Sequence, residues 1–273
     1  MILLFSSGLL FVIAYFAGIL GALTGLGGGV VIIPALVLLL HVNIYYAMGA
    51  SLLSVIATSS GTAMAYLKTG YTNLRIGIFL ETAAVMGALL GAALILVFNS
   101  SKIAIVFGVI LIVSAYLTWT HKEVDGPPKP SHPWAVKMKL EGSFPKPYTV
   151  QNVPLAWAIL LVAGALSSLL GIGSGALKVL AMDQAMKLPY KVSTATSNFM
   201  IGITAAVSAG IYFSRGYIDP VLSFPVVLGV LLGAISGGKL LHRINTKYLR
   251  IIFSIVIVFL GIQMIIKGFG GAV

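Results

Sequence analysis

Long apolar stretches without charged residues dominate the chain. No Asp, Glu, Lys or Arg occurs between residues 1 and 67, and further uncharged stretches cover 103–121, 147–177, 192–214 and 220–238. Each of them approaches or exceeds the ~20 residues that cross a bilayer as an α-helix. They are longer than transmembrane β-strands and lack the alternation that is typical of them. The pattern therefore predicts an all-α polytopic membrane protein.

Glycine and proline residues divide these stretches into two sets of elements. In the first set we expect long helices near 2–24, 44–67, 76–98 and 103–120, with a short apolar segment at 29–40. In the second set we expect long helices near 153–170, 190–213, 219–240 and 250–267, with a short segment at 174–186. The prolines and lysines crowded between the two sets predict an extramembrane linker. The predicted units are a first transmembrane repeat, a linker and a second transmembrane repeat, at residues 1–120, 121–152 and 153–273.

The two sets of helices match one another at a constant spacing. A single ungapped shift of 146 residues pairs many small and polar residues of the first set with identical residues of the second. The pairs include Gly25 with Gly171, Gly27 with Gly173, Gly29 with Gly175, Ser51 with Ser197, Thr58 with Thr204, Tyr66 with Tyr212, Gly87 with Gly233 and Gly91 with Gly237. Such self-similarity over some seventy residues predicts an internal repeat.

The orientation of the two copies depends on the glycine clusters. If each cluster forms a tight turn, the short segment returns to the side from which the helix came, and each copy enters the membrane five times. An odd number of entries inverts the second copy relative to the first. The linker and most basic loops then share one side, which the positive-inside rule makes cytoplasmic. We therefore expect inverted repeats, with the linker at 121–152 in the cytoplasm and both termini outside.

Composition narrows the class of protein further. The chain is 59% hydrophobic and 8% charged, with a mean hydropathy of +1.07. A soluble protein needs more polar surface, so soluble enzymes and nucleic-acid binders are excluded as descriptions of the whole chain. The net charge of +11 lies mostly in loops and indicates topology rather than a nucleic-acid partner. The bilayer is thus the expected environment, and cysteine chemistry is absent because the chain has no Cys.

Two glycine-rich clusters carry the candidate substrate site. They comprise Gly25, Gly27, Gly28 and Gly29 in the first copy, and Gly171, Gly173, Ser174 and Gly175 in the second. Glycines are unfavourable inside a helix, so the clusters predict breaks at membrane depth. Inverted-repeat transporters place such breaks at a midplane site and work by alternating access about it. A short helix that starts there would present free N–H groups to a small anion. The alternative is that the glycines only allow close helix packing.

These clusters, the Pro34 that follows the first one and the Gly-Tyr pairs at 70–71 and 216–217 resemble the sulfite exporter TauE/SafE family. The resemblance covers nearly the whole chain outside the linker. It implies a secondary transporter that exports a small sulfur-containing anion, such as sulfite or an organosulfonate, across the cytoplasmic membrane of a bacterium or archaeon. The second copy has Ser174 where the first has Gly28, and Leu180 where the first has Pro34, so the two half-sites are not identical.

Charged residues within the apolar stretches are few and therefore informative. Lys178 follows the second cluster and is a candidate anchor for an anion; alternatively, it pairs with Asp183 or extends to the interface. Glu81 is a candidate for proton coupling, although pairing with Arg75 or with another helix is an open alternative. We expect Asp183 to face water near the basic loop at 187–191.

Hydroxyl and amide side chains on the helices after the short segments complete the candidate substrate site: Ser51, Thr58, Thr194, Ser197 and Asn198. Such groups donate hydrogen bonds to an oxyanion, but in membrane helices they also bond to their own backbone or to a neighbouring helix.

The sequence favours neither catalysis nor a cofactor. It has no nucleotide-binding motif, and its four His residues are scattered without metal-ligand spacing. We expect a non-enzyme without metal or cofactor. Two other classes remain open, an anion channel that uses the same helix breaks and a membrane subunit that binds a partner through the linker. A homodimer could use the small-residue seams at 87–91 and 233–237, but these seams could equally serve contacts within the chain.

Overall fold

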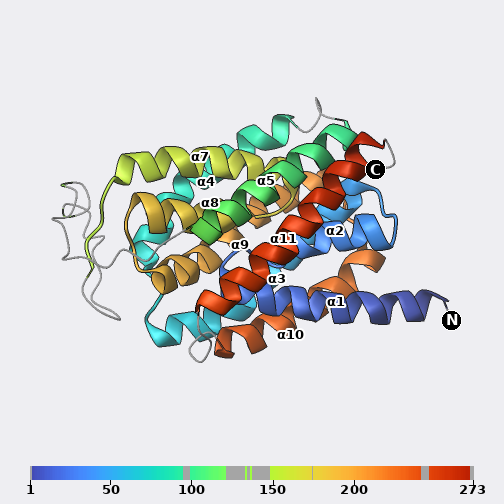
Figure 1. Ribbon diagram of the computed structural model, residues 1–273, viewed down its shortest axis with the longest axis horizontal. Coiled ribbons are helices and arrows are strands. Elements are labelled where there is room, and N and C mark those ends of the chain that lie inside the picture. The colour runs from blue at the N-terminus through green and yellow to red at the C-terminus, as the bar shows by residue number, and fades with distance from the viewer. Residues whose placement is uncertain are drawn as a thin grey trace.

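The computed structural model describes residues 2–94, 99–120, 133, 136, 148–173, 175–240 and 246–270, so most of the predicted linker lies outside the described residues. The first half contains α1 (Ile2–Thr24), α2 (Gly29–Leu39), α3 (Ile44–Thr69), α4 (Leu74–Leu94) and α5 (Ser100–Thr120). The second half contains α7 (Val153–Leu170), α8 (Gly175–Leu180), the π-helical turn η1 (Ala181–Ala185), α9 (Tyr190–Ser214), α10 (Pro220–Leu240) and α11 (Thr246–Phe269). Figure 1 shows them as one elongated helical bundle.

The prediction of an all-α protein is confirmed, and the observed helices begin and end within a few residues of the predicted bounds. The largest difference lies in the second short segment. There the α-helix stops at Leu180 and continues as one π turn, closed by a 3.1 Å bond from the N–H of Met186 to the carbonyl of Ala181. The equivalent segment of the first half, α2, stays α-helical in spite of Pro34.

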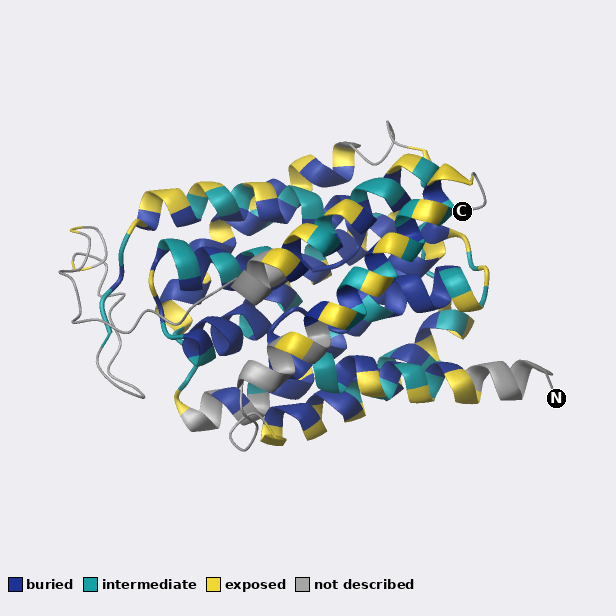
Figure 2. Cartoon of the chain, in the orientation of Figure 1, coloured by how far each residue is buried: buried dark blue, intermediate teal, exposed yellow. Residues whose placement is uncertain are grey.

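In the part of the chain that the structure describes, four helices have the length and apolarity needed to cross a membrane, with spans at Leu74–Ala93, Val153–Leu170, Tyr190–Ser214 and Pro220–Leu240. Shorter apolar helices cover Gly8–Thr24, Gly29–Leu39, Ser100–Tyr116 and Ser254–Phe269 within the described residues. Figure 2 shows buried residues on the inward faces of the helices and exposed residues on their outward faces. Many of the exposed side chains are large and apolar, among them Phe213, Phe224 and Phe259. This surface fits a hydrocarbon environment.

The two halves pack crosswise, so that α1 lies along α10 and α4 lies along α7. A Cβ on Gly229 would lie 2.5 Å from the carbonyl oxygen of Phe11, and one on Gly233 would lie 2.0 Å from that of Tyr15. The later glycine of α10 meets the later residue of α1, so the two helices run in the same direction. Likewise, a Cβ on Gly87 would lie 1.9 Å from the carbonyl oxygen of Leu161 on α7, and one on Gly91 would lie 2.0 Å from that of Ala165. These small-residue seams are thus occupied by contacts within the chain.

Residues that the 146-residue shift pairs also make equivalent polar contacts. The hydroxyl of Tyr66 donates to the carbonyl of Ala22 at 2.6 Å, and that of Tyr212 donates to the carbonyl of Ser168 at 3.0 Å. In Figure 1, α1 starts at the right end of the bundle, the end at which α11 finishes, whereas α7 starts at the left end. The equivalent helices α1 and α7 therefore start at opposite ends of the bundle.

Candidate functional site

The two glycine breaks lie against each other between the halves. A Cβ on Gly175 would lie 2.4 Å from the carbonyl oxygen of Gly25, which leaves no room for any side chain there. Gly27 and Gly173 have positive φ angles of 79° and 78°, a conformation that glycine adopts without the steric penalty of other residues. The chain therefore leaves the helix at both predicted positions and starts α2 and α8 immediately afterwards.

Two equivalent serines hold these breaks crosswise. The hydroxyl of Ser51, on α3, donates to the carbonyl of Gly171 in the other half at 2.7 Å. The hydroxyl of Ser197, on α9, lies 2.8 Å from the carbonyl oxygen of Gly25 and 3.3 Å from that of Gly175. Both serines are buried. The predicted site residues are thus brought together, with the two serine hydroxyls bonded to the backbone of the breaks.

We expect Ser51→Ala and Ser197→Ala to destabilise the protein by similar amounts. Each change removes a donor and leaves a buried carbonyl group with one fewer partner, which costs about 1–3 kcal/mol. Thermal unfolding in detergent would measure both variants, and Ser60→Ala is a matched control because the exposed hydroxyl of Ser60 bonds only within its own helix. Wild-type stability in both buried variants would contradict this role of the serines.

The other predicted polar residues border the same breaks. The Oγ1 atom of Thr58 accepts a 3.3 Å bond from the N–H of Gly28, at the start of α2. The backbone and methyl group of Thr194 lie against Gly25, and the amide nitrogen of Asn198 donates to the carbonyl of Ala22 at 2.9 Å. Ser174 lies outside the described residues.

Several buried oxygen atoms near the breaks have no hydrogen-bond partner among the described residues. They include Oγ1 of Thr194, Oδ1 of Asn198 and Oγ of Ser193 and Ser167. A buried polar atom without a partner is unfavourable by about 1–3 kcal/mol and therefore points to a bound water or ligand. These atoms are available to a bound water or ligand, whereas the hydroxyls of Ser51 and Ser197 already donate to backbone carbonyls.

Lys178 and Glu81 form a buried ion pair beside the second break. The Nζ atom of Lys178, on α8, lies 2.8 Å from Oε2 of Glu81 on α4, with the two residues 0% and 4% exposed. Thr204, on α9, completes the group, because its hydroxyl accepts a hydrogen bond from Lys178 and donates one to Oε1 of Glu81. Three helices thus contribute one side chain each to a closed ring of charge-assisted hydrogen bonds.

Sequence analysis singled out both charged residues but missed their pairing and the part of Thr204. A signal was present, because a single acid and a single base at membrane depth each need a partner of opposite charge. The expectation that Asp183 faces water is wrong, since that residue is only 6% exposed. Its place in the π turn η1, rather than in an exposed loop, accounts for the burial. No three His, Asp or Glu side chains of the described part lie close enough together to hold a metal ion.

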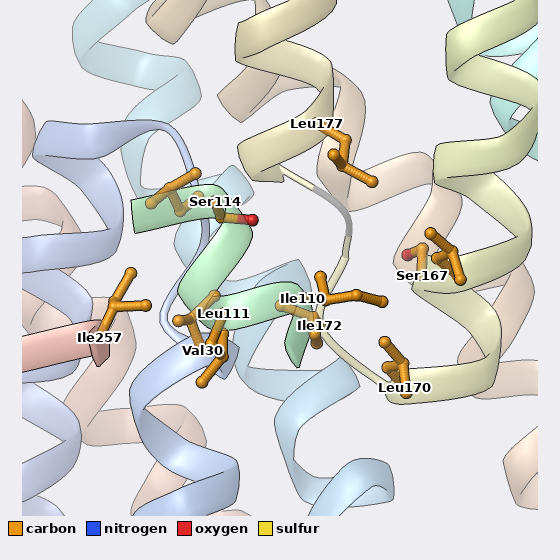
Figure 3. Close-up of a pocket in the computed structure, with 11 residues that line it drawn as sticks. Val30, Ile110, Leu111, Ser114, Ser167, Leu170, Ile172, Leu177 and Ile257 are labelled. Atoms are coloured by element: carbon orange, nitrogen blue, oxygen red, sulfur yellow. The ribbon is translucent and has the colours of Figure 1, made fainter. Parts of the chain in front are cut away.

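A small cavity adjoins both breaks (Figure 3). Its walls include Leu26 and Ile172, which occupy the second position of the two clusters, and the hydroxyl-bearing Ser114 and Ser167 face it from α5 and α7. The volume accessible to water inside it is about 20 Å³, which is room for about one water molecule. The breaks are therefore closed around little more than that volume in this conformation.

Comparisons with known proteins agree on the class. The "Probable membrane transporter protein YunE" of Bacillus subtilis (strain 168) is 30% identical over 268 residues, which cover 95% of this chain and 97% of that protein. The "Probable membrane transporter protein YdhB" of the same organism is 27% identical over 85% of this chain and 89% of its own length. The "Probable membrane transporter protein MJ0441" of Methanocaldococcus jannaschii is 24% identical over 94% of this chain and 95% of its own length.

No solved structure gives a significant match to the chain. The family model described as "Sulfite exporter TauE/SafE" matches residues 10–264, a range that includes both glycine breaks, the crosswise serines and the buried ion pair. With the apolar helical bundle and the transporter relatives, this match shows that the chain is a multi-pass membrane protein that belongs to the sulfite exporter TauE/SafE family.

Proposed function

We propose that this protein is a secondary transporter of a small sulfur-containing anion, such as sulfite or an organosulfonate, and that it works by alternating access about the two glycine breaks. The observation that carries the proposal is the direct, crosswise contact of the breaks at the centre of the bundle. Non-helical backbone is tolerated at membrane depth only where protein buries it or where it lines a wet cavity. Two such breaks in contact form a place where a small relative movement of the halves opens a path.

The inverted-repeat arrangement is part of this proposal. Its support is the direction of the helices, since α1 and its equivalent α7 start at opposite ends of the bundle while both termini share one end. Equivalent contacts in opposite orientations allow the two halves to exchange roles, so that the site opens to either side of the membrane. The basic linker then lies on the cytoplasmic side, as the positive-inside rule favours.

The substrate site in this proposal consists of the backbone at the breaks and the side chains around it. The start of α2, at Gly29, provides N–H groups and the positive end of a helix dipole, whereas the N–H of Gly28 already donates to Thr58. Thr194 and Asn198 provide polar atoms without partners, and Lys178 provides the positive charge. The substrate passes without covalent change, and the proposal requires no cofactor.

Transport in proteoliposomes tests the proposal. Vesicles with purified protein should take up radiolabelled sulfite faster than empty vesicles, with a rate that saturates with sulfite concentration. Unlabelled sulfite on the opposite side should accelerate exchange of the label, because a carrier reorients faster when loaded. Absence of uptake for sulfite, taurine and sulfoacetate would contradict the substrate class. Uptake that does not saturate, with ion currents that follow the voltage, would instead favour an anion channel with the same breaks.

A further inference from the structure

The ring of Glu81, Lys178 and Thr204 is complete in itself. Lys178 donates to one carboxylate oxygen, and Thr204 donates to the other while it accepts from Lys178. The three side chains come from α4, α8 and α9, and all three are buried. Within this ring the negative charge that balances Lys178 belongs to the protein, so an external anion must compete with Glu81 for the same ammonium group.

The equivalent positions of the repeat show that this fold does not need an ion pair here. The 146-residue shift places Ile32 at the position of Lys178 and Val227, from the other half, at the position of Glu81. Ile32 is 1% exposed and belongs to the hydrophobic core. The position equivalent to Thr204 holds Thr58, whose hydroxyl oxygen accepts a hydrogen bond from the N–H of Gly28. The repeat thus has apolar residues at one set of equivalent positions, of which Val227 is only partly buried, and two buried charges at the other.

Burial of two charges is costly, which makes their presence informative. Desolvation can exceed the attraction within a buried ion pair, and apolar residues of similar volume are often at least as stable in its place. Since the chain uses such apolar residues at the equivalent positions, stability gives no reason for the pair. Ionisable residues at membrane depth are expensive and typically belong to ion or proton pathways.

We propose that Glu81 is a tethered competitor of the substrate: its carboxylate pairs with Lys178 until a proton neutralises it, and the substrate anion then pairs with Lys178 instead. This inference rests on the proposed transport function. When Glu81 takes up a proton on its carboxylate, it loses its charge and releases Lys178, which keeps its own proton. A singly charged anion then takes the vacated place. The charge of the site is zero both in the empty ring and in the loaded, protonated state, so proton and anion travel together in the same direction.

This mechanism predicts the sign of the pH dependence. The competent state carries a proton on Glu81, so anion binding strengthens as pH falls and weakens as pH rises. Where Glu81 carries its charge in the empty protein, the apparent affinity falls by about tenfold per pH unit, because one proton is taken up with each anion. Export occurs when the outward gradient of the anion exceeds the opposing gradient of protons.

Other ionisable groups on α4 and on the elements packed against it lie farther along their helices. The helix α7 has none. On α9 the nearest titratable residue in sequence is Tyr212, eight residues after Thr204 and therefore about 12 Å away along the axis. The charged or titratable residues of α4, η1 and α9 other than Glu81 are Arg75, Asp183, Tyr190, Lys191 and Tyr212. Among the described contacts of Glu81, Lys178 is thus the charged partner.

The variant Glu81→Gln separates this mechanism from a structural role. Glutamine keeps the hydrogen bond with Thr204 but carries no charge at any pH, and so it imitates the protonated acid. The probe is ethanesulfonate, whose charge stays at minus one, with sulfite as a second probe. We expect wild-type binding in detergent to fall about tenfold per pH unit at high pH, and Glu81→Gln to bind tightly without that slope. Proton-driven accumulation in proteoliposomes should be lost in this variant, while exchange of labelled anion continues.

Two further variants make the test decisive. The double variant Glu81→Val/Lys178→Ile copies the apolar residues at the equivalent positions, Val227 and Ile32. It should fold, and any anion binding that it retains should not depend on pH. Asp183→Asn removes another buried acid and should keep the wild-type slope. If the wild type neither binds nor transports these anions, the proposed function itself fails. If the wild type transports them while Glu81→Gln keeps the full pH slope, the transporter stands and the tethered competitor is overturned.

Discussion

Lys178→Ala is expected to lower the free energy of unfolding by about 3–5 kcal/mol, because it leaves the Glu81 carboxylate buried without its positive partner. The remaining hydrogen bond from Thr204 is too weak to replace an ammonium group in so dry a place. Thermal or denaturant unfolding in detergent, at a pH where Glu81 is ionised in the wild type, would measure the loss.

The double variant Glu81→Val/Lys178→Ile is the matched control for that measurement. It removes both charges together, and replacement of a buried ion pair by apolar residues is often neutral or stabilising by about 1–4 kcal/mol. We therefore expect it to unfold at or above the wild-type temperature. A Lys178→Ala protein as stable as the wild type would contradict the buried pair, and a double variant as unstable as Lys178→Ala would mean that the charges support the fold.

Gly173→Ala is expected to lower the transport rate more than tenfold, while the protein still inserts in the membrane. The φ of +78° costs an L-residue about 1–2 kcal/mol, and the new Cβ would lie 2.6 Å from the Cγ1 atom of Val55. The break would move, and with it the contact of the two halves. Uptake of labelled sulfite in proteoliposomes, normalised to the amount of inserted protein, would measure the effect.

Companion variants separate the two causes of that loss. At Gly27 the nearest atoms are 3.2 Å or more from the added Cβ, so Gly27→Ala suffers mainly from its φ of +79° and should retain more activity. Adding Val55→Ala to Gly173→Ala relieves the clash but not the backbone strain, so it should restore only part of the rate. Gly210→Ala is the control, since nothing lies within 4 Å of its added Cβ. Normal transport by Gly173→Ala would show that the break is not at the site.

Much of the fold could be predicted because its signals are local. Apolar length sets the helices, and the breaks at Gly25 and Gly171 follow from the cost of glycine within a helix. The 146-residue shift also pointed to residues with shared tasks, of which Ser51 and Ser197 are the clearest pair. The π turn η1 was not predictable, because nothing in the sequence of Ala181–Ala185 distinguishes a wider turn from the end of a helix.

The partners within the candidate site were harder to predict, because they depend on how distant helices pack. Lys178 and Glu81 are 97 residues apart and lie on helices of different halves. Nothing in their spacing along the sequence indicates their 2.8 Å contact. Lys178 and Asp183 are five residues apart, about 140° around a helix, so helix periodicity disfavours that pairing without indicating Glu81. The ring depends on how α4, α8 and α9 pack together. The crosswise bonds of Ser51 and Ser197 required the same knowledge.

The close fit of α1 to α10 also bears on how the protein is made. Most of the chain lies between these two helices, so α1 enters the bilayer long before the ribosome has synthesised the glycines that pack against its carbonyls. Until then the contact face of α1 remains exposed to lipid or to the insertion machinery. The same holds for the seam of Gly87 and Gly91, which waits for α7. The first half therefore completes its packing only when the second half has been inserted. A nascent chain that stops before α10 would leave α1 without its partner helix, and we expect membrane quality control to degrade it.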